Sequence, residues 1–112
     1  MGKSNLGEFE ELVLLTVMIL QKEAYILKIK DELLAQAKRK SAMGALHVTL
    51  SRLEEKGFLT SDMAGATKER GGRRKRIYEL TAAGKSILSE IHETRNSMWR
   101  QIPNFALKLV HV

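Results

Sequence analysis

Apolar residues recur three and four positions apart in the first part of the chain, which is the spacing of helices that bury one face. The pattern predicts a first helix over about residues 6–20 and a second over about residues 24–38. Asn5 and Glu8 stand in a capping-box arrangement at the start of the first helix, because each side chain can bond a free backbone N–H there. Polar residues 21–23 interrupt the apolar pattern and separate the two helices.

A third helix is predicted between Ser41 and Gly57. The Ser41 hydroxyl can accept from the unpaired N–H groups of a first helical turn, so this residue is expected to be the N-cap. Gly57 can take the left-handed conformation that ends many helices, and a Schellman motif then brings Phe58 against Leu53. The core-facing stripe of this helix is expected to be Leu46, Leu50 and Leu53.

A β-hairpin and a fourth helix follow. Residues 58–63 and 74–80 favour strands, and the glycine-containing residues 65–72 form the expected loop between them. Thr81 is expected to cap the fourth helix, which should continue until Pro103 stops it. One side of that helix forms a mainly apolar seam of Leu88, Ile91, Arg95, Met98 and Ile102.

This order of elements predicts a mainly α fold with a small β-hairpin, arranged as a winged helix-turn-helix with a C-terminal dimerisation helix. We expect residues 1–80 to form the DNA-binding part and residues 81–112 the dimerisation helix and tail, within a single compact domain overall. A chain of 112 residues has a small core, which leaves little room to bury the seam of the fourth helix within the same chain. We therefore expect that seam to be buried against a second copy.

The positive charge is concentrated in the middle of the chain. The net charge is +6, and residues 38–78 alone hold 11 basic and 4 acidic side chains. Within them, residues 68–76 (KERGGRRKR) place six cations and one anion beside two glycines. Such a composition suits a polyanion such as DNA, and a solvated loop is the alternative interpretation of the charge run.

The side of the third helix opposite its core stripe is small and weakly polar. A helix that merely faced water would carry more charge, and Val48 lies too far from the core stripe to have a packing role. Small side chains let a helix approach base edges, where Ala45 and Val48 can touch thymine methyl groups and the polar residues can hydrogen-bond. The alternative to base reading is that this face of the helix is simply exposed to solvent. The candidates for base reading are Gly44, Ala45, His47, Val48, Ser51 and Arg52.

Two groups of residues flank that face and are expected to bind phosphates rather than bases. The first stands at the start of the third helix, where backbone N–H groups also favour phosphate, and consists of Lys38, Arg39, Lys40 and Ser41. The second is the wing and consists of Lys68, Arg70, Gly71, Gly72, Arg73, Arg74, Lys75 and Arg76. Alternate residues of a strand point to opposite faces, so about half of the last four cations are expected to touch DNA.

The sequence argues against an enzyme, a metal site and a membrane protein. It has no cysteine, and His47, His92 and His111 are too scattered for a zinc site, so neither metal nor cofactor is expected. The adjacent glutamate pairs point apart on helices, and residues 84–86 lack the first glycine of a phosphate loop. The longest apolar run, residues 12–20, is too short to cross a bilayer, which favours a cytoplasmic protein. The remaining alternative to a DNA-binding regulator is a winged-helix adaptor for protein or RNA.

Four segments of the chain are, in order, LGEFEELVLLTVMIL, AYILKIKDELL, GALHVTLSRLEEKGFL and ERGGRRKRIYELTAAGK. Together they resemble the PadR family of bacterial transcriptional regulators over about residues 6–88, with the last two at the family's separation. The resemblance implies a homodimeric winged-helix repressor. It also implies that residues 41–56 form the recognition helix, residues 68–78 the wing and the last helix the dimer arm.

The resemblance bears on operator and effector as well. A homodimer would place two recognition helices about one DNA turn apart, so an inverted-repeat operator is expected. Some PadR-like proteins hold planar aromatic compounds between their arms, and Met98, Trp99 and Phe105 could stack on such an effector here. A tryptophan packed in the dimer interface is the alternative. Many family members have tyrosine and proline where this chain has His47 and Val48, so its base preference is expected to differ from theirs.

Overall fold

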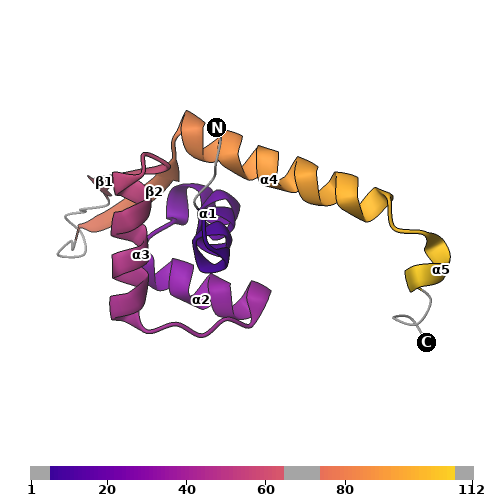
Figure 1. Ribbon diagram of the computed structural model, residues 1–112. Helices are drawn as coiled ribbons and strands as arrows, with labels where there is room; N and C mark the ends of the chain where they lie inside the picture. Colours follow the sequence, from indigo (N-terminus) through magenta and orange to yellow (C-terminus); the bar gives the residue numbers. More distant parts are fainter. Residues whose placement is uncertain (1–5, 65–73, 108–112) are drawn as a thin grey trace.

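The computed structural model describes residues 6–64 and 74–107 of the chain. Helices dominate it, and one hairpin follows the third main helix (Figure 1). The expected class, mainly α with a small β-hairpin, is therefore confirmed. In chain order the elements are α1 (Glu8–Leu20), the 3-10 helix η1 (Gln21–Glu23), α2 (Ile26–Ala37), α3 (Met43–Glu55), β1 (Leu59–Ala64), β2 (Lys75–Leu80), α4 (Ala82–Arg100) and α5 (Asn104–Leu107).

The core lies where α1, α2 and α3 pack against one another and against the hairpin. The stripe predicted for α3 is confirmed, because Leu46, Leu50 and Leu53 are fully buried. Burying an aliphatic side chain of this size stabilises a fold by about 1.5–3 kcal/mol. The buried apolar side chains among the described residues are Val13, Leu14, Val17, Ala24, Ile29, Leu33, Leu46, Leu50, Leu53, Leu59, Tyr78, Leu80 and Leu88.

The hairpin is antiparallel, and its register pairs Leu59 with Leu80 at one end and Ala64 with Lys75 at the other. The backbone N–H of Tyr78 donates to the carbonyl oxygen of Ala24, between η1 and α2, at 2.9 Å. β2 is therefore hydrogen-bonded on one edge to β1 and on the other to the segment before α2. This arrangement fixes the hairpin to the helices.

α3 ends as the sequence predicts. Gly57 has a φ of 83°, in the left-handed region that glycine adopts without a side-chain penalty. The Phe58 N–H donates to the Leu53 oxygen at 3.0 Å, and the Gly57 N–H donates to the Glu54 oxygen at 3.0 Å. These are the two hydrogen bonds of a Schellman motif.

Thr81 joins the end of α3 to the start of α4, and we call this contact the α3–α4 joint. Its hydroxyl accepts from the Gly84 N–H at 3.0 Å, so the predicted N-cap is confirmed. The same hydroxyl donates to the Gly57 carbonyl at 2.6 Å, and the Thr81 N–H donates to the Phe58 carbonyl at 3.1 Å. A Cβ atom on Gly84 would overlap the Phe58 carbonyl oxygen, so the approach of the two segments requires glycine.

The start of α1 differs from the prediction. The helix begins at Glu8 with Gly7 as N-cap, so the capping box of Asn5 and Glu8 is wrong. The Gly7 N–H donates to the Glu10 carboxylate at 2.9 Å. Because glycine has no side chain, only this half of a capping box forms, and the sequence signature of a cap is missing.

The start of α3 also differs. Its N-cap is Ala42 and its first residue Met43, so Ser41 is not the N-cap. The Ser41 hydroxyl is buried, and it has no hydrogen-bond partner among the residues that the structure describes. α2 starts at Ile26, slightly later than expected, and η1 occupies the start of the connection from α1.

The second half of α4 projects away from the packed helices (Figure 1). We call residues 91–107 the arm and the other described residues the head. The Cα radius of gyration is 17.0 Å, whereas a compact chain of this length would have about 13 Å. α4 ends at Arg100, earlier than the predicted stop at Pro103, and the short helix α5 was not predicted.

Candidate nucleic-acid interface

The outer face of α3 is open to solvent. All six base-reading candidates, Gly44, Ala45, His47, Val48, Ser51 and Arg52, are exposed, and Val48 retains 53% of its accessible surface. The core stripe of the same helix is fully buried. The predicted division of α3 into a buried side and an exposed side of small, weakly polar residues is therefore confirmed.

The outer face of α3 adjoins the start of β2. A hollow of about 310 Å³ is lined by His47 of α3 and by residues 25–27 at the start of α2. Its other side is formed by Arg74, just before β2, and by Lys75, Arg76 and Tyr78 of β2. α3 and the hairpin also lie together on the side of the molecule away from the arm (Figure 1). The candidate base-reading and phosphate-binding residues of these elements are thus brought to one side of the head.

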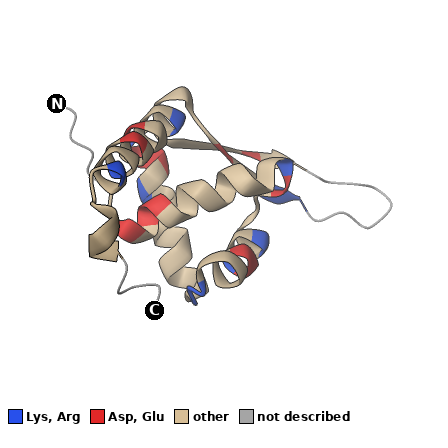
Figure 2. Ribbon diagram, turned by 90° about the vertical axis from the view of Figure 1, so that its right-hand side faces the viewer, with Lys and Arg blue, Asp and Glu red and all other residues tan. Residues whose placement is uncertain are grey.

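The cations at the base of the wing are exposed, and some of them contact other residues of the chain. Arg74, Lys75 and Arg76 lie where the hairpin meets the segment that is not described (Figure 2). The Lys75 ammonium lies 4.1 Å from the centre of the Tyr25 ring, a cation–π contact. The other wing candidates, Lys68, Arg70, Gly71, Gly72 and Arg73, fall outside the described residues.

A polar bridge connects the end of α3 to β2 through Ser61 of β1. The Ser61 hydroxyl donates to a Glu54 carboxylate oxygen at 2.7 Å, and Arg76 Nη1 donates to the Ser61 hydroxyl oxygen at 3.0 Å. Burial raises the pKa of Tyr78, and the nearby Glu54 charge raises it further while Arg76 opposes it. The bridge orients the Arg76 side chain relative to α3, and no local pattern in the sequence predicted it.

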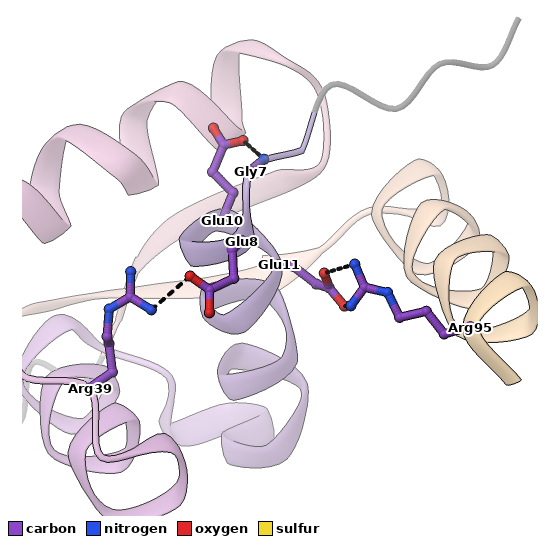
Figure 3. Close-up of polar contacts among 6 residues, drawn as sticks. All are labelled: Gly7, Glu8, Glu10, Glu11, Arg39 and Arg95. Carbon is purple, nitrogen blue, oxygen red and sulfur yellow. Dashed lines mark hydrogen bonds and ion pairs between the residues drawn. The ribbon is translucent and has the colours of Figure 1, made fainter. Parts of the chain in front are cut away.

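Arg39, a predicted phosphate ligand, is held by α1. Its Nη1 atom lies 3.0 Å from a Glu8 oxygen (Figure 3). Its guanidinium carbon lies 4.9 Å from the centre of the Phe9 ring. These contacts tie the connection between α2 and α3 to the first turn of α1. Contact of Arg39 with DNA would require breaking them, whereas Lys38 and Lys40 are exposed.

The other two acidic side chains of that first turn point in different directions (Figure 3). Glu11 forms an ion pair with Arg95 of the arm, with an N–O distance of 3.2 Å. Glu10 turns back to the Gly7 N–H and also accepts from the Lys56 ammonium at 2.9 Å. Sequence reasoning missed these pairs because their members lie 84 and 46 residues apart.

The pKa of Glu10 is lowered by its partners. Burial by itself would raise this pKa, but the hydrogen bonds from Lys56 and from the Gly7 N–H, with the positive charges of Lys56 and Arg52, outweigh that effect. The carboxylate therefore stays charged to lower pH in the folded chain than in the unfolded one. Glu10 thereby holds the end of α3 against the start of α1.

The predicted dimer seam divides between head and arm. Leu88 is only 9% exposed and belongs to the core of its own chain, so it is not part of an exposed seam. Arg95 is paired with Glu11, and Ile91 and Ile102 are half-buried. Met98, Trp99 and Phe105 remain 63%, 60% and 74% exposed. A shallow hollow of about 250 Å³ lies beside Arg95, Met98, Trp99 and Ile102, and Phe105 does not line it.

Other kinds of site find no support in the part of the chain that the structure describes. There, no group of three or more His, Cys, Asp or Glu side chains is placed to hold a metal ion. No helix within residues 6–64 or 74–107 is long and apolar enough to cross a membrane.

The sequence profile of the transcriptional regulator PadR-like family matches residues 14–90, which is more than half of the chain. The chain belongs to this family. PadR-like proteins are transcriptional regulators, which supports the expectation that the chain is not an enzyme. No curated protein matches the chain significantly.

Solved structures share the fold. A PadR-like transcription factor from Bacteroides fragilis is 27% identical, with a TM-score of 0.65 over 82% of this chain and 84% of that one. A PadR family regulator from Clostridium difficile R20291 is 29% identical, with a TM-score of 0.59 over 86% of this chain and 97% of that one. A PadR-like regulator from Bacillus cereus is 19% identical, with a TM-score of 0.69 over 89% and 91% of the two chains. These likenesses confirm the winged helix-turn-helix with a C-terminal helix, a fold of DNA-binding transcriptional regulators.

Proposed function

We propose that this PadR-like protein is a sequence-specific DNA-binding repressor that binds an inverted-repeat operator as a homodimer. The observation that carries the proposal is the exposed, nearly uncharged outer face of α3 beside the cations of β2. α3 enters the major groove, where Val48, Ser51 and Arg52 meet base edges. The wing cations and Lys38 and Lys40 bind phosphates, which sets the orientation of the head on DNA.

Dimerisation is supported by the apolar surface that the chain leaves exposed on its arm. Met98, Trp99 and Phe105 are too exposed to stabilise a lone chain, and a second copy would remove them from water. α1 offers a complementary apolar surface at Leu15 and Ile19, which are 42% and 53% exposed. Twofold symmetry then separates the two α3 helices by about one DNA turn, roughly 34 Å.

Repression and its release follow from the same assembly. A dimer that covers about one turn of a promoter blocks access of the transcription machinery to it. A planar aromatic effector bound near Met98 and Trp99 would change how the two arms meet, and hence the distance between the two α3 helices. A regulator of chromosomal genes in a bacterial cell works in the cytoplasm.

The first test selects bound fragments from genomic DNA with the purified protein and measures affinity for the best fragment and for random DNA. A regulator of this kind should prefer its operator by about 10³-fold or more, with affinity that falls steeply as salt rises. An inverted repeat in the selected fragments is expected. Weak and uniform binding to all fragments would contradict the proposal and favour the adaptor interpretation.

Single substitutions test whether α3 binds bases and the wing binds phosphates. Val48→Glu and Arg52→Ala should weaken operator binding by about tenfold or more while sparing random DNA, because each removes base contacts. Arg74→Ala should weaken both DNAs alike and reduce the salt slope by about one unit. Arg100→Ala removes the same charge from the arm and should leave both affinities unchanged. Equal losses on both DNAs for the α3 variants would contradict base reading by this face.

A further inference from the structure

The two cations of β2, Lys75 and Arg76, belong to opposite faces of the strand. Alternate strand residues point to opposite faces, so Arg76 shares the face of Tyr78, and Lys75 shares the face of Ile77. Tyr78 is buried and lines the hollow that also contains His47 of α3. Arg76 lines the same hollow. The face of β2 that carries Arg76 is therefore the face turned toward α3.

The two cations also differ in what holds them. The Lys75 ammonium lies over the Tyr25 ring, and it would have to leave this ring to reach a phosphate. Arg76 Nη1 donates to the Ser61 hydroxyl oxygen at 3.0 Å, and this partner is neutral. Among the described residues, no carboxylate lies within ion-pair distance of Arg76, and its side chain is exposed. A guanidinium has five N–H donors, so the contact with Ser61 leaves donors for a phosphate.

The Ser61 hydroxyl has only one arrangement that satisfies both of its partners. It donates to a Glu54 carboxylate oxygen at 2.7 Å and accepts from Arg76. A carboxylate only accepts and a guanidinium only donates, so the hydroxyl proton must point to Glu54 and the oxygen lone pairs to Arg76. Hydrogen bonds to charged groups are stronger than those between neutral groups. Because Glu54 belongs to the last turn of α3, this chain of contacts sets the position of the guanidinium relative to α3.

We propose that Ser61 is a positioning residue for DNA binding, which holds Arg76 in the orientation where its guanidinium meets a backbone phosphate beside α3. The inference rests on the DNA binding proposed above. A mobile arginine side chain loses rotational freedom when it binds a phosphate, and this loss weakens binding. Ser61 restricts the side chain before DNA arrives. Removal of the hydroxyl should therefore weaken binding even though the charge of Arg76 remains.

The test is a double-mutant cycle on Ser61 and Arg76, measured as the affinity of the full chain for a short DNA duplex of random sequence. A random duplex suffices because phosphate contacts do not depend on the bases. Ser61→Ala should weaken binding by about two- to fivefold, and Arg76→Ala by about three- to tenfold. In the Arg76→Ala background, Ser61→Ala should have no further effect, because the side chain that Ser61 positions is gone.

The dependence of affinity on salt separates positioning from charge. Arg76→Ala should reduce the salt slope by about one unit, because it removes a phosphate contact. Ser61→Ala should leave the slope unchanged, because the Arg76 charge remains and still reaches the phosphate.

Matched variants control for effects on the fold. Ser61→Thr keeps the hydroxyl and should bind DNA as the wild type does, whereas Ser61→Val has the same shape without the hydroxyl and should bind as Ser61→Ala does. This second pair also serves if Ser61→Ala folds poorly, because β-branched residues favour strands. Thr60→Ala removes a hydroxyl from the opposite face of β1, at an exposed position, and should not change the affinity. Denaturant titration of each variant establishes that it is folded.

Two results would overturn the inference and leave the proposed function intact. One is wild-type affinity in Ser61→Ala and in Ser61→Val. The other is an equal loss from Ser61→Ala in both backgrounds, which would mean that the hydroxyl does not act through Arg76. Failure of the unmodified chain to bind any DNA duplex would instead overturn the proposed function and this inference with it.

Discussion

The head and the arm of this PadR-like protein differ in how deeply their apolar side chains are buried. In the head, thirteen apolar side chains form one buried core, and its leucines on α3 are inaccessible to water. On the arm, the large apolar side chains of Met98, Trp99 and Phe105 each keep more than half of their surface exposed. The head therefore has a buried core of its own, although it also exposes side chains such as Leu27 and Val48, whereas no apolar side chain of the arm belongs to a buried core.

Among the substitutions that test this comparison, the one expected to destabilise the protein most lies at the α3–α4 joint. Gly84→Ala places a methyl group on the Phe58 carbonyl oxygen, a backbone atom that cannot move without shifting α3 or the start of α4. We expect the free energy of unfolding to fall by about 2–3 kcal/mol or more, measured by denaturant titration.

Gly44→Ala is the matched control for that substitution. No atom lies within 4 Å of a Cβ at Gly44, which is an exposed residue in the first turn of α3. Alanine favours helix over glycine, so stability should rise by up to about 1 kcal/mol. Similar losses in the two variants would contradict the role given to the joint.

A smaller effect on folding but a large one on assembly is expected from Met98→Glu on the arm. The head should unfold at nearly the same denaturant concentration, because Met98 is 63% exposed and outside the core. The dimer dissociation constant, measured by sedimentation, should rise by about tenfold or more, since a charge would be buried in an apolar contact. Asn96→Glu adds the same charge to an exposed position of α4 and should leave the dimer intact. Dissociation unchanged in Met98→Glu would mean that this residue lies outside the interface.

The smallest expected effect concerns pH and the pair of Glu10 and Lys56. The pKa of Glu10 is lower in the folded chain than in the unfolded one, so the unfolded chain takes up the proton first as the pH falls. The pair contributes stability above the unfolded pKa, and this contribution is lost as the pH falls through the folded pKa. Glu10→Gln should cost up to about 1 kcal/mol at neutral pH, and the difference from wild type should shrink below roughly pH 5.

Denaturant titrations of the two proteins over a pH series measure this difference. Glu55→Gln, at an exposed position of α3, serves as a control without such a trend. A difference between wild type and Glu10→Gln that stayed constant with pH would contradict the linkage.

Much of the fold could be predicted from the sequence because its signals are local. The stripe of Leu46, Leu50 and Leu53, the glycine end of α3 and the Thr81 cap each depend on residues within a few positions of one another. The start of α1 could not be predicted in the same way. Its N-cap, Gly7, has no side chain and thus none of the usual signature, whereas Asn5 looks like a cap and is not one.

The candidate interface shows the same limit. The exposed face of α3 followed from helical periodicity, because Val48 and its neighbours lie opposite the core stripe. The contacts that decide which cations are available involve distant residues. Arg39 reaches Glu8 across 31 positions, and Lys75 stacks on Tyr25. Only the folded chain brings such partners together.

The α3–α4 joint has a consequence for the DNA binding proposed above. Three hydrogen bonds and a glycine without a side chain fix the angle between α3 and α4, the helix that leads into the arm. A lever of about 28 Å, the length of nineteen helical residues, swings its end by about 5 Å for a change of about 10°. That displacement exceeds one base-pair step of about 3.4 Å. In the proposed dimer, the angle at this joint would therefore set the spacing between the two α3 helices.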